Sequence, residues 1–418
     1  ELICESEFPD KMLENGMLEL LKQLAVFSFD NQVEFGFCIR EFKDGLVQKN
    51  ASHMTMFEWL LEQNNGQNII KEMFGQWPLY LAVECGLSEQ FVQKILDTNI
   101  ASAEGVDALD KVTNESTLGL AVRTGKTEYV DVLLQAGANP NEVDPDIDMT
   151  PFAHAIRNGY VDVARKFREF SLGQDRVGNI THKVNPSLSF NGVTVAHLAA
   201  MSPDSSCTNQ KNYEEVITFL KDECGVDFDQ ARDERGRPPI FYTGSLDAVR
   251  ALGGDITVLD GEGFNIFHAA GMEVSRTDLN STIIPPKLVE DLLKDPQFAT
   301  ASKKLLRQKQ KDNPNVQNRN YLPLHRMVYR GDKGTIIAAM EDYPLACYEK
   351  SLTGRTPIFY ARNNKSLMTL IDALKSKGTT ESMLGSAFML RDKEDQTPML
   401  YAKKKGYTST LLTYFGAN

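Results

Sequence analysis

The chain has 418 residues, of which 42% are hydrophobic and 24% are charged, and its formal net charge is −12 at pH 7. At roughly 150 residues per domain, this length fits two or three domains or one elongated array. The negative charge disfavours binding of nucleic acid or an anionic membrane over the whole surface, although it permits a local basic patch. No apolar run approaches the ~18 residues that a membrane-spanning helix needs. The composition also excludes fibrous and disordered classes.

Six cysteines and six histidines are scattered along the chain. No CxxC pair and no HExxH motif occurs, so the sequence indicates no metal site, no cofactor and no disulfide framework. Thinly scattered cysteines fit a reducing, cytoplasmic setting. The first nine residues lack the features of a signal peptide.

Residues 1–73 are expected to form a helical N-terminal cap or a small domain. Within them Cys38, with His53 fifteen residues later, is the candidate for a Cys–His nucleophilic pair. The flanking Phe37 and Ile39 instead favour Cys38 as a small core residue. Apolar residues also recur at helical spacing: Leu13, Met17, Leu20, Leu21, Phe57, Leu60 and Leu61.

From residue 74 onward a short motif recurs to the end of the chain. Its clearest copy is Thr-Pro-Phe-Ala-His-Ala-Ile-Arg-Asn-Gly at 150–159. Aligned at the proline of that copy, the motif occurs at positions 78, 117, 151, 195, 239, 266, 323, 357 and 398. The steps between copies are uneven, which indicates insertions or eroded repeats.

Each copy has the features of a helix start. A Thr side chain can cap free backbone N–H groups, and Pro suits the first helical position. Apolar residues then recur with helical spacing, and a glycine such as Gly125 or Gly159 follows as the expected C-cap. A second apolar helix comes next, as at 129–135, and a polar turn leads to the following copy.

These copies resemble the ankyrin repeat, whose signature is T-P-L-H-x-A within about 33 residues. The resemblance implies an all-α repeat solenoid of about eight or nine partly degenerate helix-turn-helix repeats behind the N-terminal helical cap. The expected organisation is repeats 1–3 at 74–164, an insertion at 165–190, repeats 4–6 at 191–271, a helical insertion at 272–317 and repeats 7–9 at 318–418. The resemblance also implies that His197, His268 and His325 bond to neighbouring backbone and join repeats.

Charged residues supply the candidate partner contacts. Arg123 and Arg157 hold equivalent positions in consecutive repeats. A basic run in the long insertion is a solvated helix or a phosphate-binding patch for phosphoinositide or nucleic acid. The acidic candidates, which crowd the turn after the second repeat, are Glu142, Asp144, Asp146 and Asp148, and the basic run includes Lys303, Lys304 and Arg307.

The resemblance implies a protein-interaction scaffold, a monomer that binds a protein partner through turns and first helices. Eroded repeats also resemble, in style, the ankyrin effectors that intracellular bacteria secrete by type IV systems, which implies a host protein partner and delivery into the host cytosol. Family resemblance further makes Asn141 a candidate for hydroxylation by a host enzyme. The alternative is an effector enzyme, a Cys-dependent hydrolase whose catalytic part lies in residues 1–73 or in a flank, with repeats that select the substrate.

Overall fold

The computed structural model describes residues 43–49, 54, 57–58, 61, 78–97, 106, 109, 115–144, 149–171, 192–203, 211–270, 272–273, 282–310, 320–376, 378 and 380–405. The chain forms two compact units. Unit 1 comprises Glu1–Ala155 and Asp162–Asn185, and unit 2 comprises Ile156–Val161 and Pro186–Asn418.

A helix begins at each of the nine positions at which the motif was aligned. These first helices are α6 (Pro78–Glu84), α8 (Thr117–Arg123), α10 (Pro151–Asn158), α12 (Val195–Ala200), the 3-10 helix η4 (Pro239–Tyr242), α15 (Ile266–Ala269), α18 (Pro323–Arg330), the 3-10 helix η6 (Pro357–Tyr360) and α22 (Pro398–Lys404). The alignment of the copies is therefore confirmed.

A second helix follows most first helices after a short turn. The second helices are α7 (Glu89–Asp97), α9 (Thr127–Gln135), α11 (Val161–Ser171), α13 (Tyr213–Thr218), α14 (Leu246–Ala251), α16 (Pro286–Lys294), α19 (Lys333–Asp342) and α20 (Asn364–Ser376). Helix α13 runs directly into a π-helical turn, η3 (Phe219–Glu223). Gly125 and Gly331 lie between paired helices with φ of 68° and 81°, a left-handed conformation that any side chain would strain.

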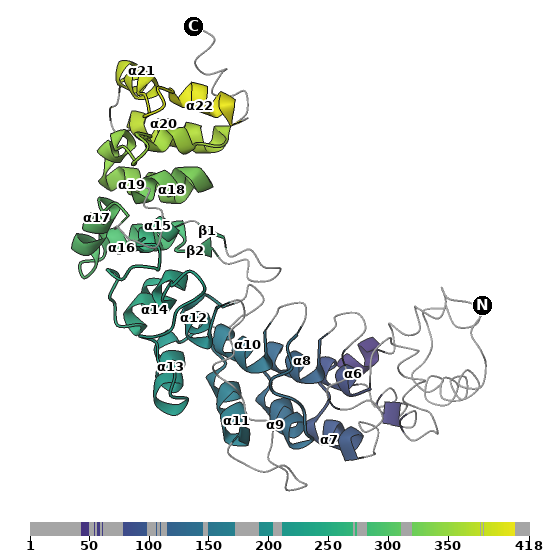
Figure 1. Ribbon diagram of the computed structural model, residues 1–418. Coiled ribbons are helices and arrows are strands. Elements are labelled where there is room, and N and C mark those ends of the chain that lie inside the picture. The colour runs from purple at the N-terminus through teal and green to yellow at the C-terminus, as the bar shows by residue number, and fades with distance from the viewer. Residues whose placement is uncertain are drawn as a thin grey trace, which may run out of the picture. The chain divides into compact units, whose positions relative to one another are not determined.

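In unit 1 the paired helices pack in two rows. The first helices α6 and α8 pack side by side, and so do the second helices α7 and α9 (Figure 1). Phe57, from the segment before the first repeat, is fully buried and stacks on Phe91 of α7 with ring centroids 5.6 Å apart. The apolar residues before residue 74 thus include one that packs against the first repeat.

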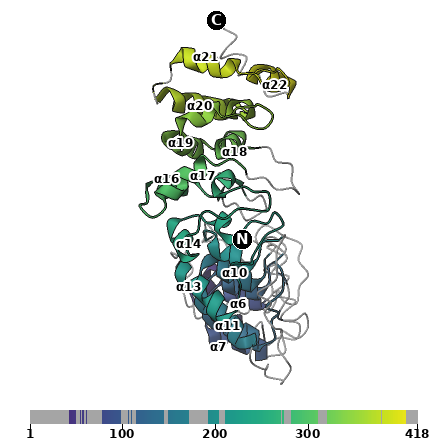
Figure 2. The same cartoon turned by 60° about the vertical axis from the view of Figure 1, so that its left-hand side comes forward.

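Unit 2 also contains two rows of helices. First helices pack in the order α12, η4, α15, α18, η6 and α22, and second helices in the order α13, α14, α16, α19 and α20. Figure 2 shows α16, α19 and α20 stacked one on another. The 3-10 helices η4 and η6 both have the sequence Pro-Ile-Phe-Tyr, and both occupy first-helix positions.

A few elements of unit 2 lie outside the two rows. Within 272–317, the two-residue strands β1 (Met272–Glu273) and β2 (Thr282–Ile283) pair antiparallel, and α17 (Ala299–Leu306) packs against α16. The 3-10 helix η5 (Pro344–Tyr348) follows α19, and α21 (Glu381–Met389) packs against α22. Apart from this small hairpin, the described regular structure is helical.

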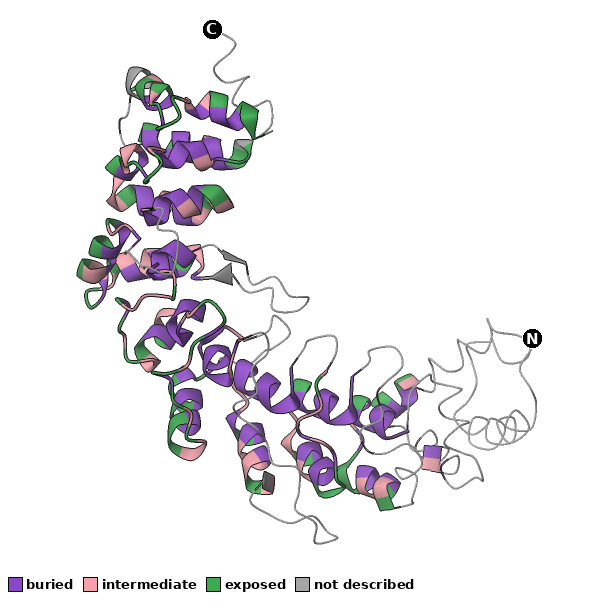
Figure 3. Ribbon diagram, viewed as in Figure 1, coloured by how far each residue is buried: buried purple, intermediate pink, exposed green. Residues whose placement is uncertain are grey.

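In each unit the core is an apolar stripe where helices of neighbouring repeats meet. Buried residues follow the facing sides of the helices (Figure 3), and the largest include Phe152, Phe167, Phe241 and Phe359. Phe241 and Phe359 stand in η4 and η6 where other repeats carry the signature histidine, and both are buried. No helix among the described residues is long and apolar enough to cross a membrane.

Candidate functional site

We call the turns that precede the first helices the fingers. In unit 2, the fingers before η4, α15 and α22 share one hydrogen-bond pattern. In these three, an aspartate six residues before the helix accepts the backbone N–H groups two and four residues further on; before η6, Ser351 stands at this place, and its hydroxyl oxygen accepts the backbone N–H of Arg355 at 3.2 Å. The donors are Arg235 and Arg237 (both 2.8 Å) for Asp233, Glu262 (2.9 Å) and Phe264 (2.8 Å) for Asp260, and Glu394 and Gln396 (both 2.9 Å) for Asp392.

Neighbouring fingers also bond to one another through their backbones. The N–H of Gly261 donates to the carbonyl of Arg235 at 3.0 Å, and the N–H of Lys393 donates to the carbonyl of Thr353 at 2.9 Å. A Cβ added to Gly236 would lie 2.8 Å from the Gly261 backbone, so this contact requires glycine. The fingers therefore form an ordered rim beside the row of first helices.

The signature histidines bind each repeat to the next one. In each case Nε2 lies near the carbonyl oxygen two residues before the next first helix, while a backbone N–H donates to Nδ1. The Nε2–oxygen distances are 2.9 Å for His197 and Arg237, 2.9 Å for His268 and Tyr321, and 3.2 Å for His325 and Arg355. Because Nδ1 accepts, Nε2 carries the proton and donates to the carbonyl.

Burial keeps these histidines neutral. It lowers the pKa of His268 to about 3 and that of His325 to about 4, and it also lowers the pKa of His197. A buried imidazole with both nitrogens engaged is unavailable for proton transfer. The role that the resemblance implied for these three residues matches their geometry.

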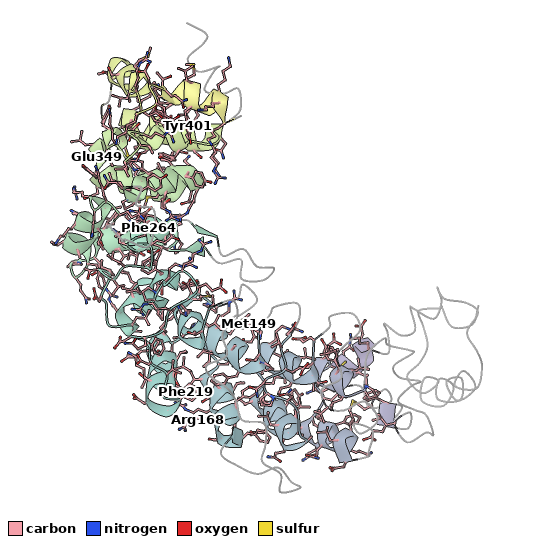
Figure 4. All side chains as sticks on the ribbon, in the orientation of Figure 1. Met149, Arg168, Phe219, Phe264, Glu349 and Tyr401 are labelled. Atoms are coloured by element: carbon pink, nitrogen blue, oxygen red, sulfur yellow. The ribbon has the colours of Figure 1, made fainter. Side chains whose placement is uncertain are left out.

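Arginines gather where two fingers meet α18. A small pocket with about 10 Å³ of enclosed space is lined by Arg235, Arg237, Arg326 and Arg330 together with Asp260, Glu262 and Phe264, among other residues, and we call it the arginine pocket. The guanidinium carbon of Arg326 lies 4.2 Å from the centre of the Phe264 ring, which Figure 4 labels. Arg330 Nη1 donates to the carbonyls of His268 (2.7 Å) and Ala270 (2.8 Å).

Arg237 differs from its neighbours because it has a carboxylate partner. It donates to Asp233 Oδ2 at 2.6 Å and to Tyr242 Oη at 2.7 Å, and Tyr242 donates to the same carboxylate at 2.6 Å. Burial opposes ionisation of Asp233, but the hydrogen bonds from Tyr242 and Arg237 outweigh it and lower the pKa of the carboxyl group. The triad fixes the finger beside η4.

The acidic candidates fall only partly within the described residues. Glu142 Oε2 accepts the side-chain amide of Asn139 at 3.2 Å, and Asp144 forms an isolated bridge with Met149. Both Glu142 and Asp144 are partly exposed. Asp146 and Asp148 lie outside the described residues, and Asn141 is partly buried beside the turn that Asn139 makes.

Both arginines predicted from the repeats lie at the ends of first helices. Arg123 makes a two-pronged ion pair with Glu115, with both N–O distances 3.0 Å, and Glu115 also accepts from Tyr80 at 3.0 Å. Arg157 is buried, and its carbonyl accepts Lys211 Nζ at 2.9 Å. The Arg123 side chain is thus held by an ion pair, and the Arg157 side chain is buried in the fold.

The basic run lies on α17, where acidic residues of the next repeat face it. Lys303 and Arg307 pair with Asp342 at 3.7 and 3.0 Å, and Lys309 pairs with Glu349 at 3.0 Å. Lys304 is exposed. Much of the positive charge of this run is therefore neutralised within the fold.

The candidate Cys–His pair, Cys38 and His53, lies outside the described residues. Cys85 and Cys347 are buried, and burial raises their thiol pKa values to about 11 and 12, which leaves them unreactive at neutral pH. No group of His, Cys, Asp or Glu side chains in the described part of the chain could hold a metal ion. A polar depression of about 810 Å³ lies beside α13 and α14.

Two comparisons with known proteins gave matches to ankyrin repeats. The family model described as "Ankyrin repeats (many copies)" matches residues 120–168. A solved structure of the ankyrin repeat domain of Bcl-3, a unique member of the IkappaB protein family, is 18% identical with a TM-score of 0.33, covering 71% of this chain and 99% of that chain. No curated protein matches. The family model falls on α8 to α11, so residues 120–168 are ankyrin repeats, and with first helices starting at every aligned position the fold is an all-α array of ankyrin-type repeats.

Proposed function

We propose that this chain is a protein-interaction scaffold that binds its partner across the fingers and first helices of unit 2. The observation that supports this is the ordered rim of fingers, held by Asp233, Asp260 and Asp392, beside the row of first helices. Rigid elements hold a recognition surface in place at a lower entropic cost on binding. Repeat arrays present such extended surfaces to other proteins.

A site-specific crosslinking experiment tests this proposal. Tyr329 is 43% exposed on α18, whereas Met389 is 75% exposed at the end of α21, away from the fingers of repeats 5 and 6. A photo-crosslinking amino acid at position 329 should capture a discrete protein, and the same amino acid at 389 serves as the matched control. Equal capture at both positions, or none at 329 from any lysate, would contradict the proposal.

The acidic finger at 142–148 is a second contact that we propose, for a basic segment of a partner. Its support is the partial exposure of Glu142 and Asp144. Changing Asp144, Asp146 and Asp148 together to Lys should abolish capture of such a partner. If capture is unchanged, the acidic finger is not a contact.

The proposal that the partner is a host protein rests only on the eroded repeats, which resemble those of ankyrin effectors from intracellular bacteria. An effector delivered by a bacterial type IV system would bind a host protein, so the captured protein should come from eukaryotic rather than bacterial lysate. A reporter fused to the intact chain should then reach the host cytosol only when the secretion system is active. Capture of a bacterial protein only would overturn this part of the proposal.

A further inference from the structure

The arginine pocket contains more positive charge than the fold compensates. Arg237 is paired with Asp233, but no carboxylate in the described part of the chain lies within ion-pairing distance of Arg326 or Arg330. Arg326 only stacks on Phe264, and Arg330 only reaches two carbonyl oxygens. Two partly buried guanidinium groups on one side of α18, four residues apart, therefore lack an anion.

The two nearby carboxylates do not supply that anion to Arg330. Asp260 uses Oδ1 to accept two backbone N–H groups of its own finger, and burial raises the pKa of its carboxyl group. Burial lowers the pKa of Arg326, although the negative charges of Glu262 and Asp260 oppose this shift. For Arg330, burial and the like charges of Arg326, Arg237 and Arg235 together lower the pKa to about 9.

Three other arginines of unit 2, by contrast, have acidic partners. Arg355 pairs with Asp392 at 2.8 Å, Arg250 with Asp295 at 2.6 Å and Arg307 with Asp342 at 3.0 Å. Isolated charges are costly to bury, and proteins usually pair them. A cluster that departs from this pattern on an exposed face suggests that the missing anion comes from a ligand.

The size of the pocket indicates the form of that anion. Its enclosed part has room for roughly one water molecule, which suits a carboxylate oxygen better than a whole phosphate group. A planar carboxylate also matches the planar fork of a guanidinium in two-pronged pairing. Beside the pocket, Tyr329 is exposed and stacks under Arg362, whose guanidinium carbon lies 3.4 Å from the ring centre. The face next to the arginines therefore offers an aromatic surface.

We propose that the arginine pocket receives a Glu or Asp side chain from an acidic, extended segment of a partner protein, with Arg326 and Arg330 pairing to its carboxylate and Tyr329 contacting a neighbouring residue of that segment. This inference rests on the proposed function and adds the chemistry of the partner. It assigns an acidic ligand to a protein whose own net charge is negative. Binding should weaken as salt rises, since screening reduces such pairing.

The test uses the intact chain and a fluorescein-labelled synthetic peptide with Glu at alternate positions, compared with the same peptide carrying Gln. We expect the Glu peptide to bind more tightly, and Arg326→Gln to reduce its affinity by about tenfold. Arg330→Gln should do the same, but it also removes bonds to two carbonyls. Arg326→Gln, whose side chain makes no hydrogen bond among the described residues, therefore gives the decisive result.

The matched control is Arg391→Gln, which removes the same charge from an exposed arginine paired with Asp395. Its affinity for the Glu peptide should stay within about twofold of the unchanged protein. Equal binding of the Glu and Gln peptides, equal effects of Arg326→Gln and Arg391→Gln, or displacement of the peptide by millimolar inorganic phosphate would each overturn the inference. If Arg326→Gln leaves crosslinking of a partner at position 329 intact, the inference fails while the proposed function stands.

Discussion

At the scale of single residues, neutral polar side chains join the repeats of unit 2. His197, His268 and His325 each donate a hydrogen bond to the backbone of the following repeat. All three side chains are buried, so water does not reach their ring nitrogens. Their depressed pKa values mean that the unfolded chain binds protons that the folded chain does not. The stability of unit 2 should therefore depend on pH near neutrality.

Lowering the pH from 7.5 to 5.5 should destabilise the protein. The folded-state pKa values of about 3 for His268 and 4 for His325 lie below the usual value of about 6.5, so the stability they contribute is present above pH 6.5 and is lost as the pH falls toward 4. Each histidine contributes about 1.4 kcal/mol over this range, or about 3 kcal/mol for the pair. Urea unfolding followed by circular dichroism at both pH values measures this change. In the double variant His268→Gln and His325→Gln most of the pH dependence of the free energy of unfolding should disappear. If that free energy changes with pH as much as in the unchanged protein, the two histidines are not its cause.

Lys211 is a second residue whose removal should be costly. It is buried, and its ammonium group donates to the carbonyls of Arg157 (2.9 Å), Leu198 (3.1 Å) and Met201 (3.0 Å), which lie at the ends of α10 and α12. Lys211→Met should lower the free energy of unfolding by about 3 kcal/mol, because buried acceptors lose their donor. Lys221→Met, on the exposed side of η3, is the matched control and should cost less than about 1 kcal/mol. Equal urea midpoints for the two variants would contradict this account.

At the scale of elements, the first helices could be predicted from the sequence, whereas the arginine pocket could not. The starts of the first helices could be predicted from the recurring motif, with Thr-Pro at 150–151, 356–357 and 397–398, and from its apolar spacing, because those effects are local. The shared finger pattern was also readable, since Asp233, Asp260 and Asp392 each stand six residues before an aligned position, but it was missed. The arginine pocket could not be predicted, because Arg235 and Arg330 are brought together only by the stacking of repeats.

One finger departs from the others at its turn. Where Gly236, Gly263 and Gly354 adopt φ between 69° and 79°, the last described finger has Asp395 with φ 59°. Asp395→Gly should stabilise the protein by about 0.5–1 kcal/mol, since glycine adopts this conformation without strain and the exposed pair with Arg391 contributes little. Thermal unfolding measures the gain.

Gly354→Ala provides the converse change in the neighbouring finger. Its Cβ would lie 3.0 Å from the backbone nitrogen of Lys393, and its φ is +79°, so it should destabilise the protein by about 1–2 kcal/mol. A lower melting temperature for Asp395→Gly than for the unchanged protein would show that the aspartate side chain, rather than the backbone, determines this turn.

At the scale of the whole molecule, stability is built from contacts between neighbours in sequence. Within each unit, a first helix packs against the first helices before and after it, and a second helix does likewise. The contacts that join repeats, such as His325 with the carbonyl of Arg355, reach only the next repeat. In such an array a local loss should spread to adjacent repeats and fade with distance.

Hydrogen exchange on the intact chain tests this expectation with His325→Gln. The variant loses the bond to Arg355, so backbone amides of α18 and of the finger and 3-10 helix at 351–360 should exchange faster than in the unchanged protein. Amides of α8 and α9 should keep their rates, because these helices belong to unit 1 whereas His325 belongs to unit 2. Lys304→Gln, an exposed change on α17, is the control and should alter neither region. A uniform rise in exchange that includes α8 and α9 would mean that the repeats unfold as one cooperative body rather than by neighbouring pairs.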